Sequence, residues 1–281
     1  MQNEEEIMGY NQEDWRNVDD SDNSELFVNM LDATTAQTEV NRYKKKTYQL
    51  LNIASGSSVL DIGCGTGDDV LALAELVGLN GKVVGLDNSK SLIEQANERS
   101  KQKQFPFEFR VGDVYKLDFA DNTFDGCRAD RVFQHLQDRH QALSEMIRVT
   151  RPGGRIVVFD PDWDTMIVEA PDRDLTRKII DHFVDQLVLN PWCGRESYKL
   201  FQQLGLENVV VADTATFVLM DFSTAKQLWK FDEVADLIRE ENPILADKVE
   251  SWESYLKQAD DEGVFFGAVT GFTVVGEKSS S

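Results

Sequence analysis

The sequence predicts an α/β fold in which a mostly parallel sheet carries helices on both faces. Strand-like and helix-like segments alternate over residues 57–160, and a glycine-rich bend joins the first of these strands to the helix that follows it. With 281 residues and 41 % hydrophobic content, the chain is also large and apolar enough to bury a core. Such alternation requires right-handed crossovers between parallel strands, which helices cover on both sides.

The glycine-rich bend directly follows the apolar run Val59–Ile62 and places Gly63, Gly65 and Gly67 at alternate positions. A strand that turns through glycine into a helix brings a ligand against exposed backbone N–H groups. The dinucleotide fingerprint G-x-G-x-x-G would require its last glycine at the position of Asp68. The bend therefore departs from the pattern of cofactors that carry a pyrophosphate.

Hydrophobic periodicity and turn residues place the other elements. Strands are expected at 57–62, 81–87, 105–111, 123–129, 154–160, 207–219 and 264–275, and helices at 36–53, 68–78, 89–103 and 139–150, and within 165–204 and 224–262. The segment Arg151–Gly154 is expected to break the chain before the fifth strand. We expect one domain over 36–281 with helical insertions at about 163–193 and 224–262, preceded by a lid segment over 1–35.

The net charge of −21 restricts the partners of the chain. A surface so acidic repels phosphate backbones and anionic lipids, and the Lys44–Lys46 cluster, expected on the solvated face of a helix, is too small for a nucleic-acid site. We expect a small-molecule substrate, no nucleic acid and no membrane, and a monomer or homodimer. The acidic N-terminus lacks the layout of a signal peptide, and the three cysteines form no disulfide framework, which indicates a reducing cytoplasm.

Three segments together resemble a known family. The bend from Asp61 to Gly67 resembles motif I of the class I S-adenosylmethionine (SAM) dependent methyltransferases, Phe124–Leu136 resembles their fourth-strand segment, and Arg148–Asp164 resembles their fifth-strand segment. The resemblance covers residues 50–160 well and indicates the small-molecule group called type 11. It implies a Rossmann-like, seven-stranded sheet of order 3-2-1-4-5-7-6 with an antiparallel last strand and a helical lid, and SAM as the cofactor.

Residues at the carboxyl ends of the strands are candidates for binding this cofactor, because ligands of parallel sheets bind there. Asp87 can accept from both ribose hydroxyls, although a helix N-cap is the alternative and a NAD enzyme would also use this acid. Asp113 can accept from the adenine amino group or serve only in a turn. Arg128 can meet the methionine part, or pair with Asp125 or Asp130. The complete expected set is Asp61, Gly63, Cys64, Gly65, Asp87, Asn88, Asp113, Val114 and Arg128.

The resemblance also implies catalytic residues. Related natural-product and sugar methyltransferases often place two adjacent histidines after the fourth strand and an acid at the end of the fifth, which here correspond to Gln134-His135 and Asp160. His135 is the expected general base and Asp160 the expected second catalytic residue, and a structural, half-buried histidine is the alternative. An amine acceptor would need no base. The residues expected to contact the substrate are Tyr10, Trp15, Phe133, Gln134 and Trp163.

The expected function is transfer of the SAM methyl group to an oxygen, nitrogen or carbon nucleophile of a small molecule such as a specialised metabolite. A SAM-binding cyclase or a ligand-binding protein on the same fold would carry the same cofactor residues and is the alternative. A NAD-dependent dehydrogenase is opposed by Asp68. No metal site is expected, because a calcium loop over the acids that begin at Asp160 would need glycine at Thr165 and a bidentate acid at Pro171.

Overall fold

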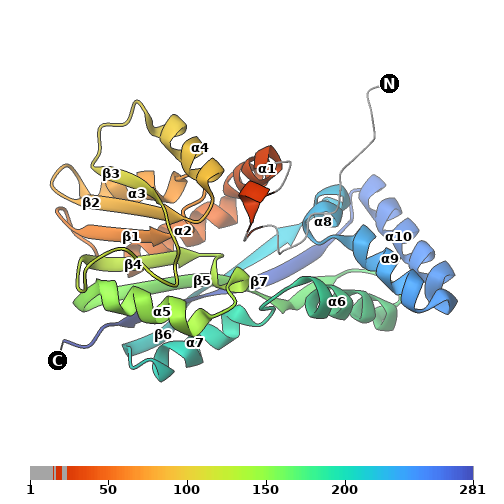
Figure 1. Ribbon diagram of the computed structural model, residues 1–281. Helices are drawn as coiled ribbons and strands as arrows, with labels where there is room; N and C mark the ends of the chain where they lie inside the picture. The colour runs from red at the N-terminus through yellow and green to blue at the C-terminus, as the bar shows by residue number, and fades with distance from the viewer. Residues whose placement is uncertain (1–14, 16, 21–23, 281) are drawn as a thin grey trace.

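A seven-stranded sheet in the order β3-β2-β1-β4-β5-β7-β6 forms the centre of the protein (Figure 1). The computed structural model describes residues 15, 17–20 and 24–280. Strand β7 is antiparallel to both of its neighbours, and the five strands from β3 to β5 are parallel, so the expected order and direction are confirmed. The strands are β1 Ser58–Ile62, β2 Lys82–Asp87, β3 Phe107–Val111, β4 Phe124–Asp130, β5 Thr150–Val168, β6 Glu207–Leu219 and β7 Gly267–Glu277.

Helices cover both faces of the sheet because the strands alternate their apolar side chains between two cores. In β1, Val59 packs with α3 and α4, whereas Leu60 and Ile62 face the core under α5 and α7. The helices are α1 Ser24–Thr35, α2 Thr38–Leu50, α3 Asp68–Val77, α4 Lys90–Ser100, α5 Arg139–Val149, α6 Arg173–Leu187, α7 Cys193–Gln203, α8 Phe222–Leu228, α9 Phe231–Glu241 and α10 Ala246–Asp261. None of these helices has the length and apolar character that a bilayer span requires.

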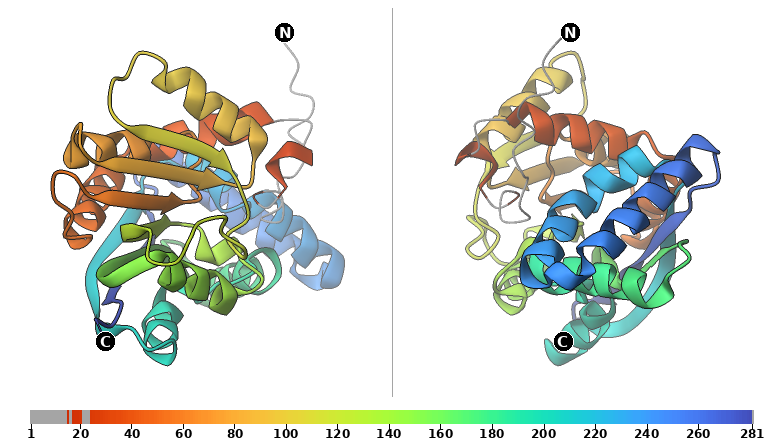
Figure 2. Two further views of the ribbon diagram at one scale, coloured as in Figure 1. Left: turned by 60° about the vertical axis from the view of Figure 1, so that its left-hand side comes forward. Right: turned by 90° about the vertical axis from the view of Figure 1, so that its right-hand side faces the viewer.

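Four helices, α6, α8, α9 and α10, form a cover with a core of its own beyond the far ends of β5, β6 and β7 (Figure 2). The rings of Phe231 and Trp252 meet edge to face at 5.3 Å, and Trp252 Nε1 donates to Thr176 Oγ1 at 3.0 Å. Met166 and Val269, from β5 and β7, pack into the same core. The cover is therefore fastened to the sheet by extended strands rather than by a flexible linker.

The N-terminal part of the described chain packs on α4. Asp19, in the short 3-10 helix Val18–Asp20, accepts from the backbone N–H groups of Lys90 and Ser91 at 2.7 and 3.0 Å, and Arg99 pairs with Asp32 of α1. These contacts hold α1 along the carboxyl edge of the sheet. Whether the segment before residue 36 acts as a lid stays a prediction, and Tyr10 lies outside the described residues.

Strand β5 differs from the sequence expectation at both ends. It begins at Thr150 and runs through Pro152 and the two glycines that were expected to break the chain, with an irregular register opposite Phe124. At the other end it extends to Val168, where a helix was expected, because β7 continues to pair with it as far as Gly267. The long ladder is a tertiary effect that no local pattern encodes.

A buried charge cluster behind the glycine-rich bend is a second correction. Lys44, expected in solvent, is buried and its Nζ lies 2.7 Å from Asp69. Arg128, whose side chain is 1 % exposed, donates to Asp61 at 2.8 Å and to Asp130 at 2.9 Å. Additional hydroxyl partners come from α2, namely Tyr43, Thr47 and Tyr48. Three carboxylates thus share two cations, and burial raises the pKa of Asp61 to about 7 despite the attraction of Arg128.

Replacing the central cation should destabilise the fold strongly. We expect Arg128→Met to lower the free energy of unfolding by about 3–5 kcal/mol, since it leaves buried carboxylates without their partner. Arg151→Met is the matched control, because the Arg151 guanidinium is half exposed and pairs with Asp125 at the surface, so about 1 kcal/mol or less is expected. If urea unfolding shows an equal loss in the free energy of unfolding for both variants, the stabilising role of Arg128 in the cluster is contradicted.

Candidate functional site

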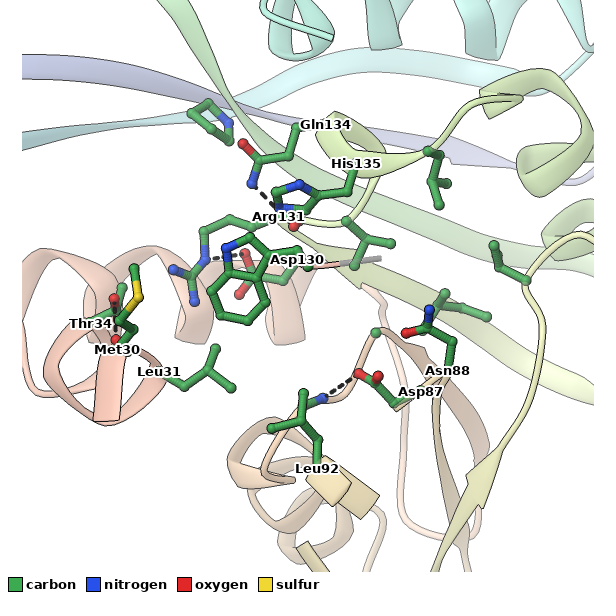
Figure 3. Close-up of a pocket in the computed structure, with 18 of the residues that line it drawn as sticks. Met30, Leu31, Thr34, Asp87, Asn88, Leu92, Asp130, Arg131, Gln134 and His135 are labelled. Carbon is green, nitrogen blue, oxygen red and sulfur yellow. Dashed lines mark hydrogen bonds and ion pairs between the residues drawn. The ribbon is translucent and has the colours of Figure 1, made fainter. Parts of the chain in front are cut away.

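A cavity of about 550 Å³ opens at the carboxyl ends of β1, β2 and β4 (Figure 3). Its floor comes from the strand ends and the glycine-rich bend, one wall from α1, and the far wall from β5, β6, β7 and the end of α8. The residues that line it include Trp15, Met30, Leu31, Thr34, Gln37, Gly63, Gly65, Asp87, Asn88, Leu92, Asp113, Val114, Asp130, Arg131, Gln134, His135, Pro161, Trp163, Phe217, Leu219, Leu228, Trp229 and Val269.

The glycine-rich bend is left-handed at each of its glycines. Gly63, Gly65 and Gly67 have φ values of 64°, 51° and 88°. A Cβ on Gly63 would come within 2.4 Å of a Val132 methyl group, and one on Gly67 within 2.6 Å of the Phe109 ring. The bend therefore accepts no side chain at these two positions, and Gly63 and Gly65 face the cavity with their bare backbone.

Asp87, at the end of β2, connects the bend to the next helix. Its Oδ2 accepts from the Gly65 N–H at 2.9 Å and its Oδ1 from the Ser89 N–H at 3.0 Å. The N-cap of α4 is Ser89, whose hydroxyl accepts from the Leu92 N–H, so the capping role considered for Asp87 belongs to Ser89. Burial raises the pKa of Asp87. The carboxylate is fixed at the cavity wall with lone pairs left to accept from a ligand.

The third strand end supplies the neighbouring part of the wall. Asp113 and Val114 follow β3 and line the cavity, as does Leu92 from α4. Asp113 Oδ1 accepts from the Tyr115 N–H at 2.8 Å, which fixes the turn. Asp113 thus fixes the turn and also lines the cavity, so the two roles considered for it do not exclude each other. Asn88 lies beside Asp87 on the same wall.

The segment after β4 forms the opposite side, where a short 3-10 helix spans Phe133–His135. The Gln134 side chain accepts from Trp163 Nε1 at 2.9 Å and donates to the Arg131 carbonyl at 3.2 Å. The ring of His135 lies 6.0 Å from that of Trp15. Gln134 therefore orients Trp163, while His135 and Trp15 form a tilted aromatic contact on the cavity wall.

A family model described as "Methyltransferase domain" matches residues 53–194, which include the bend and all the strand ends discussed above. The chain belongs to this methyltransferase family. SAM is its cofactor, and the protein is a SAM-dependent methyltransferase.

Individual proteins support the assignment. The chain is 34 % identical over 250 residues to an uncharacterized 37.1 kDa protein in a transposon of Streptomyces fradiae, an alignment that covers 89 % of this chain and 71 % of that protein. It is 36 % identical to a demethylmenaquinone methyltransferase of Bacillus cereus over 60 % of this chain and 78 % of that enzyme. Other relatives of that name align over about half of their length.

The fold of this methyltransferase also resembles a solved structure. A protein of Bacillus halodurans that is described as a methyltransferase superposes with a TM-score of 0.60 at 18 % identity. The match covers 84 % of this chain and 98 % of that one. At this identity the likeness supports the fold.

Several residues of the methyltransferase lie on the cavity as expected from the sequence, and others do not. Gly63, Gly65, Asp87, Asn88, Asp113, Val114, Trp15, Gln134, His135 and Trp163 line it. Asp61, Cys64, Arg128, Phe133 and Asp160 are buried behind its wall. Arg128 pairs with Asp61 and with Asp130, the second of which is the alternative expected for it, while Cys64 and Phe133 pack in hydrophobic cores. A role of these residues in binding stays a prediction.

Other lining residues of the methyltransferase were missed by sequence reasoning. Asp130 ends β4 and Arg131 directly follows it, and their position at a strand end could have identified them. Phe217 and Leu219 come from β6 and Trp229 directly follows α8, all beyond the matched segment that ends at residue 194, and no local signal brings them to the cavity. Only the tertiary arrangement shows that they share one cavity with the bend.

Asp160 is buried at the end of the core part of β5, where its Oδ1 accepts from the Gln134 N–H at 3.1 Å. Burial raises the pKa of Asp160 well above its usual range, and backbone N–H groups and Arg139 oppose this only in part. Its Oδ2 has no hydrogen-bond partner among the described residues, so nothing there offsets the cost of burying the charged form. Asp160 therefore supports the short helix that carries His135 rather than the cavity itself.

The raised pKa of Asp160 predicts a pH-dependent stability difference. A group whose pKa is higher in the folded state stabilises the protein below its unfolded pKa of about 3.9 and loses that contribution as the pH rises. The amide in Asp160→Asn does not titrate, so this variant does not lose that contribution. The melting temperature of the variant minus that of the wild type should therefore increase from pH 5 to pH 8. A difference that stays constant over this range in thermal unfolding would contradict the assignment.

Proposed function

We propose that this methyltransferase transfers the methyl group of SAM to an oxygen, nitrogen or carbon nucleophile of a small, largely apolar molecule such as a specialised metabolite. The observation that carries the proposal is that one cavity is lined both by polar residues at the strand ends and by large apolar residues from β6, β7 and the end of α8. A nucleoside and an acceptor could then meet inside a single cavity, which would align the two reactants.

The polar residues at the strand ends would hold the cofactor. Asp87 is held by two backbone N–H groups, which leaves its outer lone pairs for the ribose hydroxyls. Asp113 and the backbone of Val114 would face the adenine ring, and Gly63 and Gly65 would lie against the amino-acid end. When bound, SAM supplies a sulfonium-activated methyl group.

The large apolar residues of the lining would surround the acceptor, namely Trp163, Phe217, Leu219, Trp229 and Val269. Trp163 is held at Nε1 by Gln134 and packs edge to face on Phe183 of the cover. The demethylmenaquinone methyltransferase relative acts, by its name, on demethylmenaquinone. The aromatic and aliphatic lining of the present cavity would pack on an apolar molecule with a ring system, so we propose this substrate class for the present enzyme.

His135 would take the proton of a hydroxyl or carbon-acid acceptor, because it lines the cavity. Asp160 would act as a positioning residue, since its carboxyl holds the Gln134 N–H next to His135. Trp15 would close the space beside His135. The acidic surface, with a net charge of −21, favours a small molecule over a nucleic acid.

The experiment that tests the function is incubation of the protein and methyl-labelled SAM with fractionated metabolite extracts, followed by mass spectrometry. The proposal predicts release of S-adenosylhomocysteine together with a product that carries one additional labelled methyl group. Apolar, ring-containing fractions should give the signal. Conversion of a compound without a gain of methyl would contradict the proposal and support a cyclase or ligand-binding protein on this fold.

With an active fraction in hand, His135→Asn should lower kcat by about 100- to 10,000-fold, the usual contribution of a general base, and leave SAM affinity within about twofold. His140→Asn is the matched control, since His140 is exposed on α5. Both rates are measured with the same labelled-methyl assay. If the two variants are equally active, the acceptor is deprotonated without His135 and the base role is wrong.

A further inference from the structure

Arg131 is the single lysine or arginine among the described residues that line the cavity. The other ionisable side chains on its wall include the carboxylates Asp87, Asp113 and Asp130. In a chain with a net charge of −21, one cation placed among carboxylates at a ligand cavity needs an explanation. It makes this part of the wall the place where a negatively charged group can bind.

The backbone of Arg131 is held in an unusual conformation. Its φ is +58°, in the left-handed region that residues with a side chain rarely adopt. The Arg131 N–H donates to the Phe159 carbonyl at 2.7 Å, and the Arg131 carbonyl accepts from Gln134 Nε2 at 3.2 Å. Hydrogen bonds on both sides therefore fix this strained residue, and such strain concentrates at ligand-binding sites.

The guanidinium of Arg131 forms only a long ion pair with its neighbour Asp130 and no hydrogen bond. Its Nε lies 3.8 Å from Asp130 Oδ1, beyond hydrogen-bond distance, and is buried without a hydrogen-bond partner among the described residues. Asp130 is instead satisfied from behind, by Arg128 at 2.9 Å and by the Tyr43 hydroxyl at 3.0 Å. The buried Nε is out of a ligand's reach, but the Arg131 side chain is 22 % exposed and lines the cavity, so a ligand would meet its terminal nitrogens.

The position of Arg131 indicates which partner. The next residue, Val132, touches Gly63 so closely that a Cβ there would clash, which places Arg131 beside the glycine-rich bend. Figure 3 shows its side chain on the side of the cavity where Met30 and Thr34 lie, with Asp87 across from it. The large apolar residues that line the same cavity come from other elements, β6, β7 and the end of α8. Arg131 thus belongs with the residues proposed to hold the cofactor.

We propose that Arg131 binds the α-carboxylate of the methionine part of SAM, in place of Arg128, which the charge cluster occupies. A planar guanidinium forms two parallel hydrogen bonds to a carboxylate, which fixes orientation as well as charge. The methionine part would thereby be anchored at its far end while Asp87 holds the ribose. This inference rests on the SAM cofactor and not on the identity of the acceptor.

Calorimetric titrations with two ligands test the proposal. S-adenosylhomocysteine has the amino-acid tail, and 5′-methylthioadenosine has the same nucleoside without it. Arg131→Met should weaken S-adenosylhomocysteine binding by about 10- to 100-fold, as loss of a charged hydrogen bond does, and leave 5′-methylthioadenosine within about twofold. Arg131→Lys should fall between, because it keeps the charge and loses the bidentate geometry.

Arg173→Met is the control, since Arg173 is exposed at the start of α6. This variant should bind both ligands as tightly as the wild type does. Equal weakening of both ligands by Arg131→Met would show a role in folding and overturn the proposal. Unchanged S-adenosylhomocysteine binding would also overturn it, and would leave a carboxylate on the acceptor as the partner. If the wild type binds neither ligand, the cofactor assignment fails first.

Discussion

The site depends on the two hydrogen bonds that the Asp87 carboxylate accepts from the backbone of Gly65 and Ser89. One oxygen holds the glycine-rich bend, and the other holds the start of α4, so two loops are fixed relative to the end of β2. Both contacts use backbone donors and survive any change of neighbouring side chains. The same carboxylate remains directed at the cavity, where it can meet a nucleoside that lies across the strand ends.

Around this point the protein uses arginine in two distinct ways. Arg128 is enclosed by Asp61, Asp69 and Asp130, and this cluster ties α2 and α3 to the central strands. Arg131, three residues later, has left the strand and lies on the cavity with its side chain partly exposed. The first stabilises the wall and the second is available to a ligand. The left-handed backbone at Arg131 separates the two roles.

Much of the fold followed from local patterns, because parallel strands buried on both faces have a strong apolar signal. The bounds of β6 matched the expected 207–219, and the bend with Asp87 was recognisable from its glycines and its acid. The sequence predictions were wrong where contacts with distant segments determine the burial of a side chain or the length of a strand. Lys44 is buried because carboxylates from other elements surround it, and the length of β5 depends on β7. The apolar part of the cavity lining joins residues from β6 and α8, which local sequence does not connect.

A crystal structure of the protein with S-adenosylhomocysteine tests the central claim most directly. The account predicts that both ribose hydroxyls lie within hydrogen-bond distance of the Asp87 carboxylate, while Gly65 and Ser89 keep their bonds to it. The same electron density would show the bend against the amino-acid end of the ligand. A ribose that makes no contact with Asp87, or a nucleoside bound outside this cavity, would contradict the account.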